Sequence, residues 1–312
     1  MRGDDPQDAT TPLDWHGGVA QGNGVDIVWE EAGPVGGEPL LLVMGLAGQL
    51  IHWPDMLCRD LVARGFRVIR FDNRDIGLSG DSDRGVRFSM PVDWWRSRQQ
   101  QPVRANYTLH DMAADVVGLL DALAVDRANV AGVSMGGMIA QLLAAQHGSR
   151  VRSLTSIMSS TNDPRLPPPR PRVLWHMSGI GQPKDHSREA VLRRYVKLFR
   201  MIGSPAYPTP ESELRQRGSI TYDRSYRPAG MLRQTHAILA TGSIEPLLER
   251  IEAPTQIVHG LADPLLRPAC GRRSAQLISG SRLELIPGMG HDLPKALMPR
   301  LAELIAGNAA RV

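Results

Sequence analysis

Short apolar runs alternate along this chain with longer stretches in which apolar residues recur at helical spacing. The clearest run, residues 40–44, is apolar at every position and stops at Gly45, which is typical of a strand buried on both faces of a parallel sheet. Strands are predicted over residues 25–29, 40–44, 66–71, 129–133, 151–158, 255–259 and 282–286. Helices are predicted over residues 53–64, 108–123, 135–147, 269–278 and 293–306. The alternation predicts an α/β fold with a mostly parallel, doubly wound sheet and right-handed crossovers.

Two segments interrupt this alternation. Residues 161–243 contain no strand pattern, open with a Pro- and Arg-rich stretch, and continue with helical patterns such as residues 190–201. We therefore expect a helical cap at 161–243, inserted into one α/β core built from residues 21–160 and 244–312, with residues 1–20 as a loose N-terminal arm. The shorter interruption, residues 83–106, carries Trp94 and Trp95 among several arginines. It is either a second wall of the same cleft or a surface loop with anchored aromatic side chains.

The composition is that of a globular protein, with 42% hydrophobic and 22% charged residues. The net charge of +4 comes without a clustered basic stripe, so no nucleic-acid partner is expected. Cys58 and Cys270 lack the spacing of a disulfide framework or a zinc site and are expected to be reduced and buried. No signal-peptide pattern and no apolar stretch of membrane-spanning length is present, so we expect a cytoplasmic protein without a membrane partner.

Residues 132–136, Gly-Val-Ser-Met-Gly, form a GxSxG motif. In a sharp strand-to-helix turn the backbone is crowded, so small residues are needed two positions before and after the serine. The motif is weak by itself, but here it follows a predicted strand and opens a predicted helix. This context predicts that Ser134 is a nucleophile projecting from the edge of the sheet.

A serine hydroxyl needs a base to remove its proton, and the base is usually a histidine oriented by a carboxylate. In hydrolases with this turn the chain order is serine, acid, histidine. Asp263 follows the predicted strand 255–259, and His291 lies in a Gly-rich loop after strand 282–286. Because open α/β sheets place their sites at the carboxyl ends of the strands, Ser134, Asp263 and His291 are predicted to form a catalytic triad.

Four other residues are alternatives for the base or the acid. Asp163 follows strand 151–158 and is a second possible acid. Asp292 adjoins His291, although neighbouring side chains on one backbone rarely orient each other. His147, at the end of a helix, and His259, within a strand, are expected to be structural.

The tetrahedral intermediate of acyl transfer needs hydrogen-bond donors for its oxyanion. The backbone N–H of Met135, at a helix N-terminus directly after the nucleophile, is one predicted donor. The second is predicted to be the N–H of Leu46, in the loop after strand 40–44, where Gly45 lets the chain turn. A simple glycine turn without this function is the alternative.

These residues resemble the α/β-hydrolase superfamily over about residues 24–308. Residues 71–79 resemble its Asp-x-Arg-Gly-x-Gly-x-Ser loop, with Asp75 in place of the usual glycine. The substitution predicts a slightly different loop conformation. Asp72 and Arg74 are read as structural rather than catalytic.

Within the superfamily, the chain is similar to the aclacinomycin methylesterase group. The similarity rests on Met44-Gly45 where many members have His-Gly, on the eight residues from Ser134 to Gln141, and on the Ile-Pro-Gly-Met-Gly-His sequence that ends at His291. It implies hydrolysis of small carboxylic esters and the two backbone oxyanion donors named above. The likeness is weakest in the cap, so the polyketide substrate of that group is not carried over.

The predicted reaction is two-step acyl transfer from a small-molecule ester, without a metal or organic cofactor. Cofactor-free perhydrolases and carbon–carbon bond hydrolases use the same triad and remain alternatives. Acyl transfer to an acceptor other than water and a non-catalytic binding role are less favoured. The sequence does not determine the acyl and alcohol groups or the oligomeric state.

The predicted cap is markedly basic. Residues 164–245 contain 14 Lys or Arg and 6 Asp or Glu, so the rest of the chain has a net negative charge. One hypothesis is that the cap attracts anionic substrates. The favoured alternative is a solvated helical surface.

Overall fold

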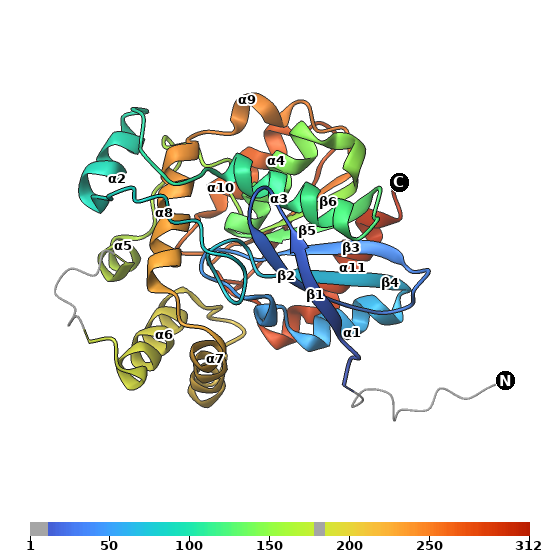
Figure 1. Cartoon of the computed structure of the whole chain (residues 1–312), viewed down its shortest axis with the longest axis horizontal. Helices are drawn as coiled ribbons and strands as arrows, with labels where there is room; N and C mark the ends of the chain where they lie inside the picture. The colour runs from blue at the N-terminus through green and yellow to red at the C-terminus, as the bar shows by residue number, and fades with distance from the viewer. Residues whose placement is uncertain (1–11, 178–184) are drawn as a thin grey trace.

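The computed structural model describes residues 12–177 and 185–312 and contains one eight-stranded sheet with helices on both faces (Figure 1). The strand order is β1-β2-β4-β3-β5-β6-β7-β8. The pairs from β4 to β8 are parallel, whereas β1 and β2 pair antiparallel at one edge. The strands are β1 (His16–Gln21), β2 (Asp26–Ala32), β3 (Glu38–Val43), β4 (Phe66–Phe71), β5 (Ala128–Val133), β6 (Val151–Ile157), β7 (Thr255–Gly260) and β8 (Arg282–Ile286). The predicted mostly parallel α/β fold is confirmed.

The sheet is buried on both faces because its central strands are apolar at consecutive positions. In β3, Leu40 and Leu42 belong to the apolar cluster under α1 (Asp55–Ala63) and α11 (Met298–Ala309). Leu41 and Val43 point the other way and belong to the cluster that packs against the second helical layer. That layer consists of α3 (Leu109–Ala122), α4 (Met135–Gln146), α9 (Glu245–Leu248) and α10 (Pro268–Leu277).

Between β6 and β7 the chain forms a helical segment, residues 161–243, which we call the insertion. Its helices are α5 (Pro171–Met177), α6 (Arg188–Ile202), α7 (Glu211–Arg224) and α8 (Pro228–Thr241), and its described residues include no strand. Figure 1 shows these helices together at the left of the molecule. The chain leaves and re-enters the core at one place, where the N–H of Ile244 donates to the carbonyl of Thr161 (3.0 Å).

The shorter interruption at residues 83–106 contains a helix, α2 (Met90–Arg98). This helix packs against α8 of the insertion, and the rings of Phe88 and His236 stack with their centroids 3.9 Å apart. Trp94 and Trp95 are both exposed on α2. The segment is therefore attached to the insertion.

Two predicted boundaries differ most from the structure. Residues 16–20, predicted to belong to a loose arm, lie in β1, which pairs with β2 along its whole length. The strand is mostly exposed and Gly-rich, so its order comes from backbone pairing that no apolar pattern reveals. Residues 1–11 of that arm lie outside the described residues. The last helix begins at Met298 rather than at residue 293, because Pro294 and a 3-10 turn at Lys295–Leu297 precede it.

Both cysteines are unpaired and buried, as predicted. Burial raises the pKa of the Cys58 thiol to about 12, so it stays protonated. Within residues 12–177 and 185–312, no helix combines the length and the apolar character needed to cross a membrane.

Candidate active site

Ser134 occupies a strained turn between β5 and α4. Its φ of 53° and ψ of −121° lie outside the regions that residues with a side chain normally adopt. The N–H of Ser134 donates to the carbonyl of Ile157 at the end of β6 (3.0 Å), which ties the turn to the neighbouring strand. The predicted sharp turn between strand and helix is therefore present at Ser134.

The two glycines of the motif are needed because three backbone segments meet at this turn. A Cβ at Gly132 would lie 2.3 Å from the carbonyl oxygen of Gly136. A Cβ at Gly136 would lie 2.1 Å from the carbonyl oxygen of Val43 in β3. Both distances are far below van der Waals contact, so any other residue would push α4 away from β3 or β5.

The structure brings Ser134, His291 and Asp263 together in one hydrogen-bonded line. The imidazole Nε2 of His291 is 3.0 Å from Ser134 Oγ, and its Nδ1 is 2.7 Å from Asp263 Oδ2. A carboxylate can only accept, so Nδ1 carries the proton and donates it to Asp263. The lone pair on Nε2 then faces the serine hydroxyl, which is the arrangement that a general base requires.

The Asp263 carboxylate is fully buried and held by its own loop. Its Oδ1 accepts from the backbone N–H groups of Leu265 (2.8 Å) and Leu266 (2.9 Å), which leaves Oδ2 for the imidazole. His259 in β7 supports the same loop, because its Nε2 lies 2.8 Å from the carbonyl of Leu266. Burial lowers the pKa of His259, which favours the neutral form of its ring. This agrees with the structural role expected for His259.

The loop that carries His291 is held by the insertion. The N–H of His291 donates to the carbonyl of Ile202 at the end of α6 (2.7 Å). The hydroxyl of Ser204 accepts from the N–H of Gly290 (2.9 Å) and donates to Asp292 Oδ1 (2.5 Å). Asp292, an alternative acid, is therefore engaged by Ser204, and burial raises the pKa of its carboxyl group.

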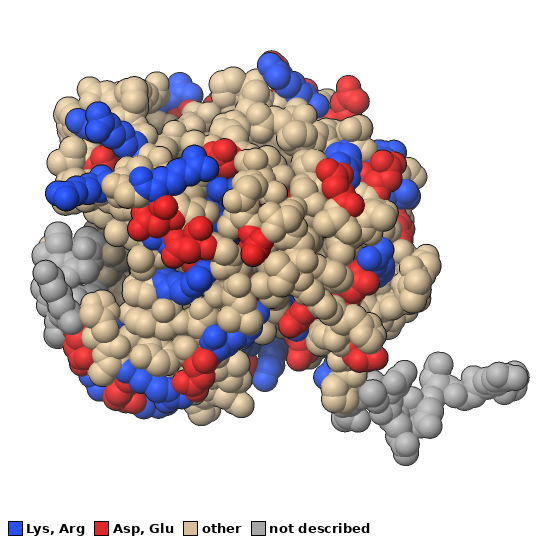
Figure 2. Space-filling view, in the orientation of Figure 1, with Lys and Arg blue, Asp and Glu red and all other residues tan. Residues whose placement is uncertain are grey.

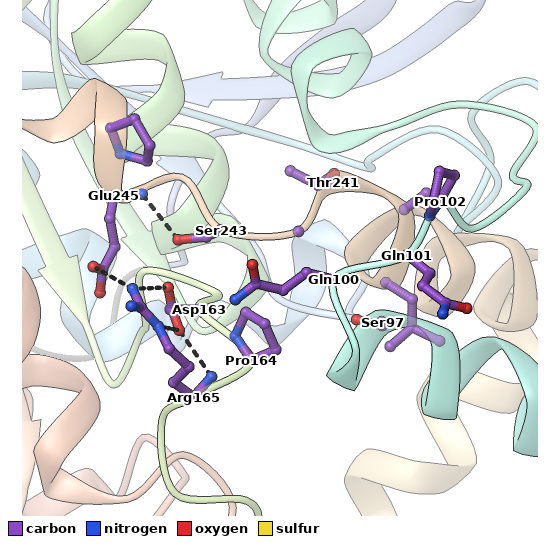
Figure 3. Close-up of a pocket in the computed structure, with 14 residues that line it drawn as sticks. Ser97, Gln100, Gln101, Pro102, Asp163, Pro164, Arg165, Thr241, Ser243 and Glu245 are labelled. Atoms are coloured by element: carbon purple, nitrogen blue, oxygen red, sulfur yellow. Dashed lines mark hydrogen bonds and ion pairs between the residues drawn. The ribbon is translucent and has the colours of Figure 1, made fainter.

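Asp163, the other alternative acid, lines a cavity of about 650 Å³ together with Arg165 and Glu245, and no triad residue is among the residues that line this cavity (Figure 3). Its carboxylate accepts from Nε (2.9 Å) and Nη2 (2.8 Å) of Arg165. These hydrogen bonds lower the pKa of Asp163 to about 2. In Figure 3 Arg165 lies between Asp163 and Glu245. The carboxylate is thus committed to a guanidinium group rather than to an imidazole.

The loop predicted to supply an oxyanion donor packs directly against the nucleophile. A Cβ at Gly45 would lie 3.1 Å from Cβ of Ser134, so a side chain there would force one of the two segments to shift by a few tenths of an ångström. The N–H of Gly48 donates to the carbonyl of Gly45 (3.0 Å), which closes a tight turn around Leu46. Met135 is the first residue of α4, and its N–H is one of the terminal donors that have no partner within the helix. The backbones of both predicted donor residues therefore adjoin Ser134.

Several residues around this loop were not identified from the sequence. Gln49 donates through Nε2 to the carbonyls of Thr221 (2.9 Å) and Ser225 (2.8 Å) in the insertion. The Nε2 of His52 lies 2.7 Å from the hydroxyl of Thr221, while its Nδ1 accepts from the N–H of Gln49 (3.2 Å). Because Gln49 and Thr221 are 172 positions apart, no local pattern marks these contacts.

In the Asp-x-Arg loop after β4, Asp72 and Arg74 make structural contacts, which is the role expected from the sequence. Asp72 is buried and accepts from the N–H groups of Leu50 (2.8 Å) and Leu78 (2.9 Å). Arg74 forms a buried ion pair with Asp115, with Nη2 and Oδ1 2.6 Å apart. The two side chains fix the loop next to residues 44–50 and do not contact the triad directly.

Asp75, which replaces the usual glycine of this loop, has a φ of 71° and a fully buried carboxylate. Arg233 on α8 holds it through Nε (2.9 Å) and Nη2 (3.0 Å), and the hydroxyl of Tyr107 donates to it as well (2.6 Å). A Cβ at Gly230 would lie 2.0 Å from the carbonyl oxygen of Asp75, so α8 is docked closely on this loop. The departure from the family pattern is therefore coupled to the insertion.

Known proteins resemble this chain along most of its length. A family model described as the alpha/beta hydrolase fold matches residues 38–294. A rhodomycin D methylesterase from Streptomyces peucetius is 30% identical over 90% of this chain and 94% of its own length. A putative carbamate hydrolase from Variovorax paradoxus is 27% identical over 84% of this chain and 88% of its own length.

Solved structures agree on the fold. A hydrolase from Pseudomonas aeruginosa superimposes with a TM-score of 0.68 at 23% identity, covering 97% of this chain and 100% of the other. A meta-cleavage product hydrolase from Pseudomonas fluorescens gives a TM-score of 0.70 at 18% identity, covering 95% of this chain and 98% of the other. Together with the family match and the strand order, these likenesses show that the chain belongs to the α/β-hydrolase fold family.

Proposed function

We propose that this protein hydrolyses carboxylic esters through a covalent acyl-enzyme, with Ser134 as nucleophile, His291 as general base and acid, and Asp263 as the group that orients the imidazole. The observation that carries the proposal is the hydrogen-bonded line from Ser134 Oγ through His291 to Asp263, with steps of 3.0 and 2.7 Å. The three residues come from three separate loops at the carboxyl ends of β5, β7 and β8. Such a line does two jobs at once: it activates a hydroxyl and fixes the tautomer of its base.

The proposed reaction begins when His291 Nε2 takes the proton of Ser134 as Oγ attacks the ester carbonyl. The N–H groups of Leu46 and Met135 bind the oxyanion, and one such donor typically contributes about 10²–10³ to kcat. His291 then gives the proton to the leaving alcohol. In the second half of the cycle it activates a water molecule that releases the acid and regenerates Ser134.

The methylesterase relative supports an ester with a small alcohol, such as a methyl ester, as the substrate class to test first. We propose that the insertion acts as a cap over this site. Its contacts with the His291 loop through Ile202 and Ser204, and with the Leu46 loop through Thr221 and Ser225, support that role. A perhydrolase or a carbon–carbon bond hydrolase would use the same triad, and turnover on the different substrates named below distinguishes these activities from ester hydrolysis.

Basic residues of the proposed cap pair with acidic residues of the core, which supports a role in attaching the cap rather than in attracting anionic substrates. Arg224 pairs with the buried Asp72 of the core (2.8 Å), and Arg233 pairs with Asp75 (2.9 Å). On the face seen in Figure 2, blue and red side chains lie next to each other over the α6–α7 region, so little single-sign field is left there. We expect salt to change the rates on a neutral and an anionic ester equally, and a selective loss on the anionic ester would restore the steering hypothesis.

The test combines labelling with turnover. The wild-type protein is incubated with a serine-directed organophosphate, the modified peptide is identified by mass spectrometry, and turnover is measured on short-chain aryl and methyl esters, a peracid-forming mixture and a vinylogous diketone. We expect label on Ser134 and the highest kcat/KM on an ester. Ser134→Ala should lower kcat by several orders of magnitude with an unchanged circular dichroism spectrum.

Ser153→Ala is the matched control. Ser153 is also buried, but it donates to Asn129 within the sheet (2.7 Å) and does not touch the triad. We expect this variant to keep its ester turnover. Label on another residue, or a Ser134→Ala variant as active as Ser153→Ala, would overturn the proposal.

A further inference from the structure

Gln234, on helix α8 of the insertion, is fully buried beside the loop that carries Leu46. Its Oε1 accepts from the N–H of Ala47 (2.9 Å), and its Nε2 donates to the carbonyl of Arg74 (2.9 Å). One amide thus joins the two core loops that follow β3 and β4. Resting on the proposed function, we infer that Gln234 is a positioning residue that holds the Leu46 N–H in its oxyanion-binding orientation.

The Leu46 turn needs outside support because of Ala47. Its φ is 57°, and a residue with a Cβ is disfavoured in this left-handed conformation. Glycine would adopt it freely, but the chain has alanine here. The hydrogen bond from the Ala47 N–H to Gln234 stabilises the strained conformation, because without it this part-buried N–H would lose its acceptor.

The conformation of Ala47 sets the direction of the Leu46 N–H. The carbonyl of Gly45 and the N–H of Leu46 belong to one planar peptide unit and point in opposite directions. Gly48 holds that carbonyl through its own N–H (3.0 Å), and Gly48 is placed there by the backbone of Ala47. Releasing Ala47 therefore lets the whole peptide unit rotate, and the donor rotates with it.

The other end of the amide is anchored firmly. The carbonyl that Nε2 reaches belongs to Arg74, whose guanidinium is locked to the buried Asp115. The residue before Gln234 is Arg233, whose bidentate bond to Asp75 fixes α8 on the same loop. Asn73 adds a direct link, donating through Nδ2 to the carbonyl of Met44 (2.9 Å). Gln234 is therefore the contact through which the insertion helix α8 reaches the turn itself.

The test uses Gln234→Met, which keeps the length of the side chain and removes both hydrogen bonds. We expect kcat to fall roughly ten- to hundredfold, less than the loss of a whole oxyanion donor, with KM changed by less than about threefold. The dissociation constant of an alkyl trifluoromethyl ketone, whose adduct with Ser134 places an oxyanion where the intermediate has one, should rise by the same factor as kcat falls. The acid limb of the pH–rate profile should stay in place, because His291 is untouched.

The matched control is Asn308→Leu. Asn308 is also buried, and its amide donates to the carbonyl of Leu154 in the middle of β6 (2.8 Å) and to that of Pro254 directly before β7 (3.1 Å), so it bonds neither to the triad nor to the Leu46 loop. It should lower the thermal midpoint to a similar degree without changing kcat or ketone affinity. Should Gln234→Met fail to fold, Gln234→Asn, which is one methylene too short to span both partners, takes its place with the same expectation.

The outcomes separate this inference from the proposed function. If the wild-type protein turns over esters and Ser134→Ala abolishes that turnover, the proposed function stands whatever Gln234 does. Equal kcat and ketone affinity in Gln234→Met and the wild type would then overturn the inference alone. A loss of ketone affinity in Asn308→Leu as large as in Gln234→Met would also overturn it, because the effect would then follow general stability.

Discussion

Asp263→Asn tests the triad most sharply, because the surrounding backbone dictates how the new amide must lie. Oδ1 of Asp263 accepts from two N–H groups, those of Leu265 and Leu266. In the variant the amide oxygen must take this position, since an NH₂ group there would face two donors. The amide nitrogen is then left at the position of Oδ2, 2.7 Å from Nδ1 of His291.

That geometry forces the imidazole into the wrong tautomer. The amide nitrogen donates to Nδ1, so the ring proton moves to Nε2 and points at the serine hydroxyl. His291 can no longer accept the proton of Ser134. Hydrolases that lose the carboxylate in this way fall about 10⁴-fold in kcat, which corresponds to about 5.4 kcal/mol of transition-state stabilisation.

The fold should survive the substitution. Asparagine has the shape of aspartate and keeps both backbone hydrogen bonds of the Asp263 loop. Asp263→Ala, in contrast, would leave the part-buried N–H groups of Leu265 and Leu266 without acceptors, at a cost of up to about 1–3 kcal/mol each. The asparagine variant therefore separates the chemistry from the stability of the loop.

The assay is steady-state hydrolysis of a short-chain aryl ester, with thermal midpoints recorded for each variant. The matched controls are Asp163→Asn and Asp292→Asn, which remove the two alternative acids, and both should keep kcat within about tenfold of the wild type. A kcat for Asp263→Asn above a tenth of the wild-type value, at an unchanged midpoint, would refute the tautomer reasoning. If Asp163→Asn lost as much kcat as Asp263→Asn, the orienting acid would be Asp163, after β6, instead of Asp263, after β7.

Three further perturbations test the connections around the site. Arg233→Met leaves the Asp75 carboxylate buried without its cation and should lower the free energy of unfolding in urea by about 3–5 kcal/mol; an unchanged urea midpoint would contradict the docking of α8. Burial and two nearby guanidinium groups lower the pKa of His52 from 6.5 to about 4. Between pH 6.5 and pH 4, His52 is therefore protonated in the unfolded chain but not in the folded chain. Going from pH 7 to pH 4 should cost about 3 kcal/mol of the free energy of unfolding in urea through this residue. His52→Gln should lack this contribution, and an equal loss in the variant would contradict the assignment. Ser204→Ala removes the hydrogen bonds to Gly290 and Asp292 on either side of His291 and should lower kcat roughly ten- to hundredfold with KM nearly constant. Both values are measured over a range of ester concentrations. An equal rise in KM would indicate that Ser204 acts on substrate binding by the proposed cap instead.

Sequence patterns sufficed where the information is local. The strand at Phe66–Phe71 was predicted with its observed boundaries, because its four apolar residues are buried in the two apolar clusters on either face of the sheet. The triad was also predicted, since GxSxG and two loops after strands are short motifs in a fixed order. The structure places these side chains within hydrogen-bond distance, while their roles stay predictions for the assays above.

The remaining features depend on contacts between distant segments. β1 is ordered by its partner strand and not by an apolar face, so the arm prediction failed for residues 16–20. Gln234 and Ser204 look like ordinary polar residues of helical or loop segments, and only the folded chain brings them to Ala47 and Gly290. Asp75 was noticed as a departure from the family loop, but its partner Arg233 is 158 positions away.

The single hydrogen bond between Thr161 and Ile244 has a consequence for exchanging parts between enzymes. Because the chain exits and returns at one point, a foreign helical segment with closely spaced ends can be spliced in there without disturbing any strand. In such a chimera the strained turn at Ala47 would lose its hydrogen bond, unless the transplanted helix places a side-chain amide where Gln234 lies. A new insertion chosen to change substrate preference must therefore also supply the residue that positions the oxyanion donor.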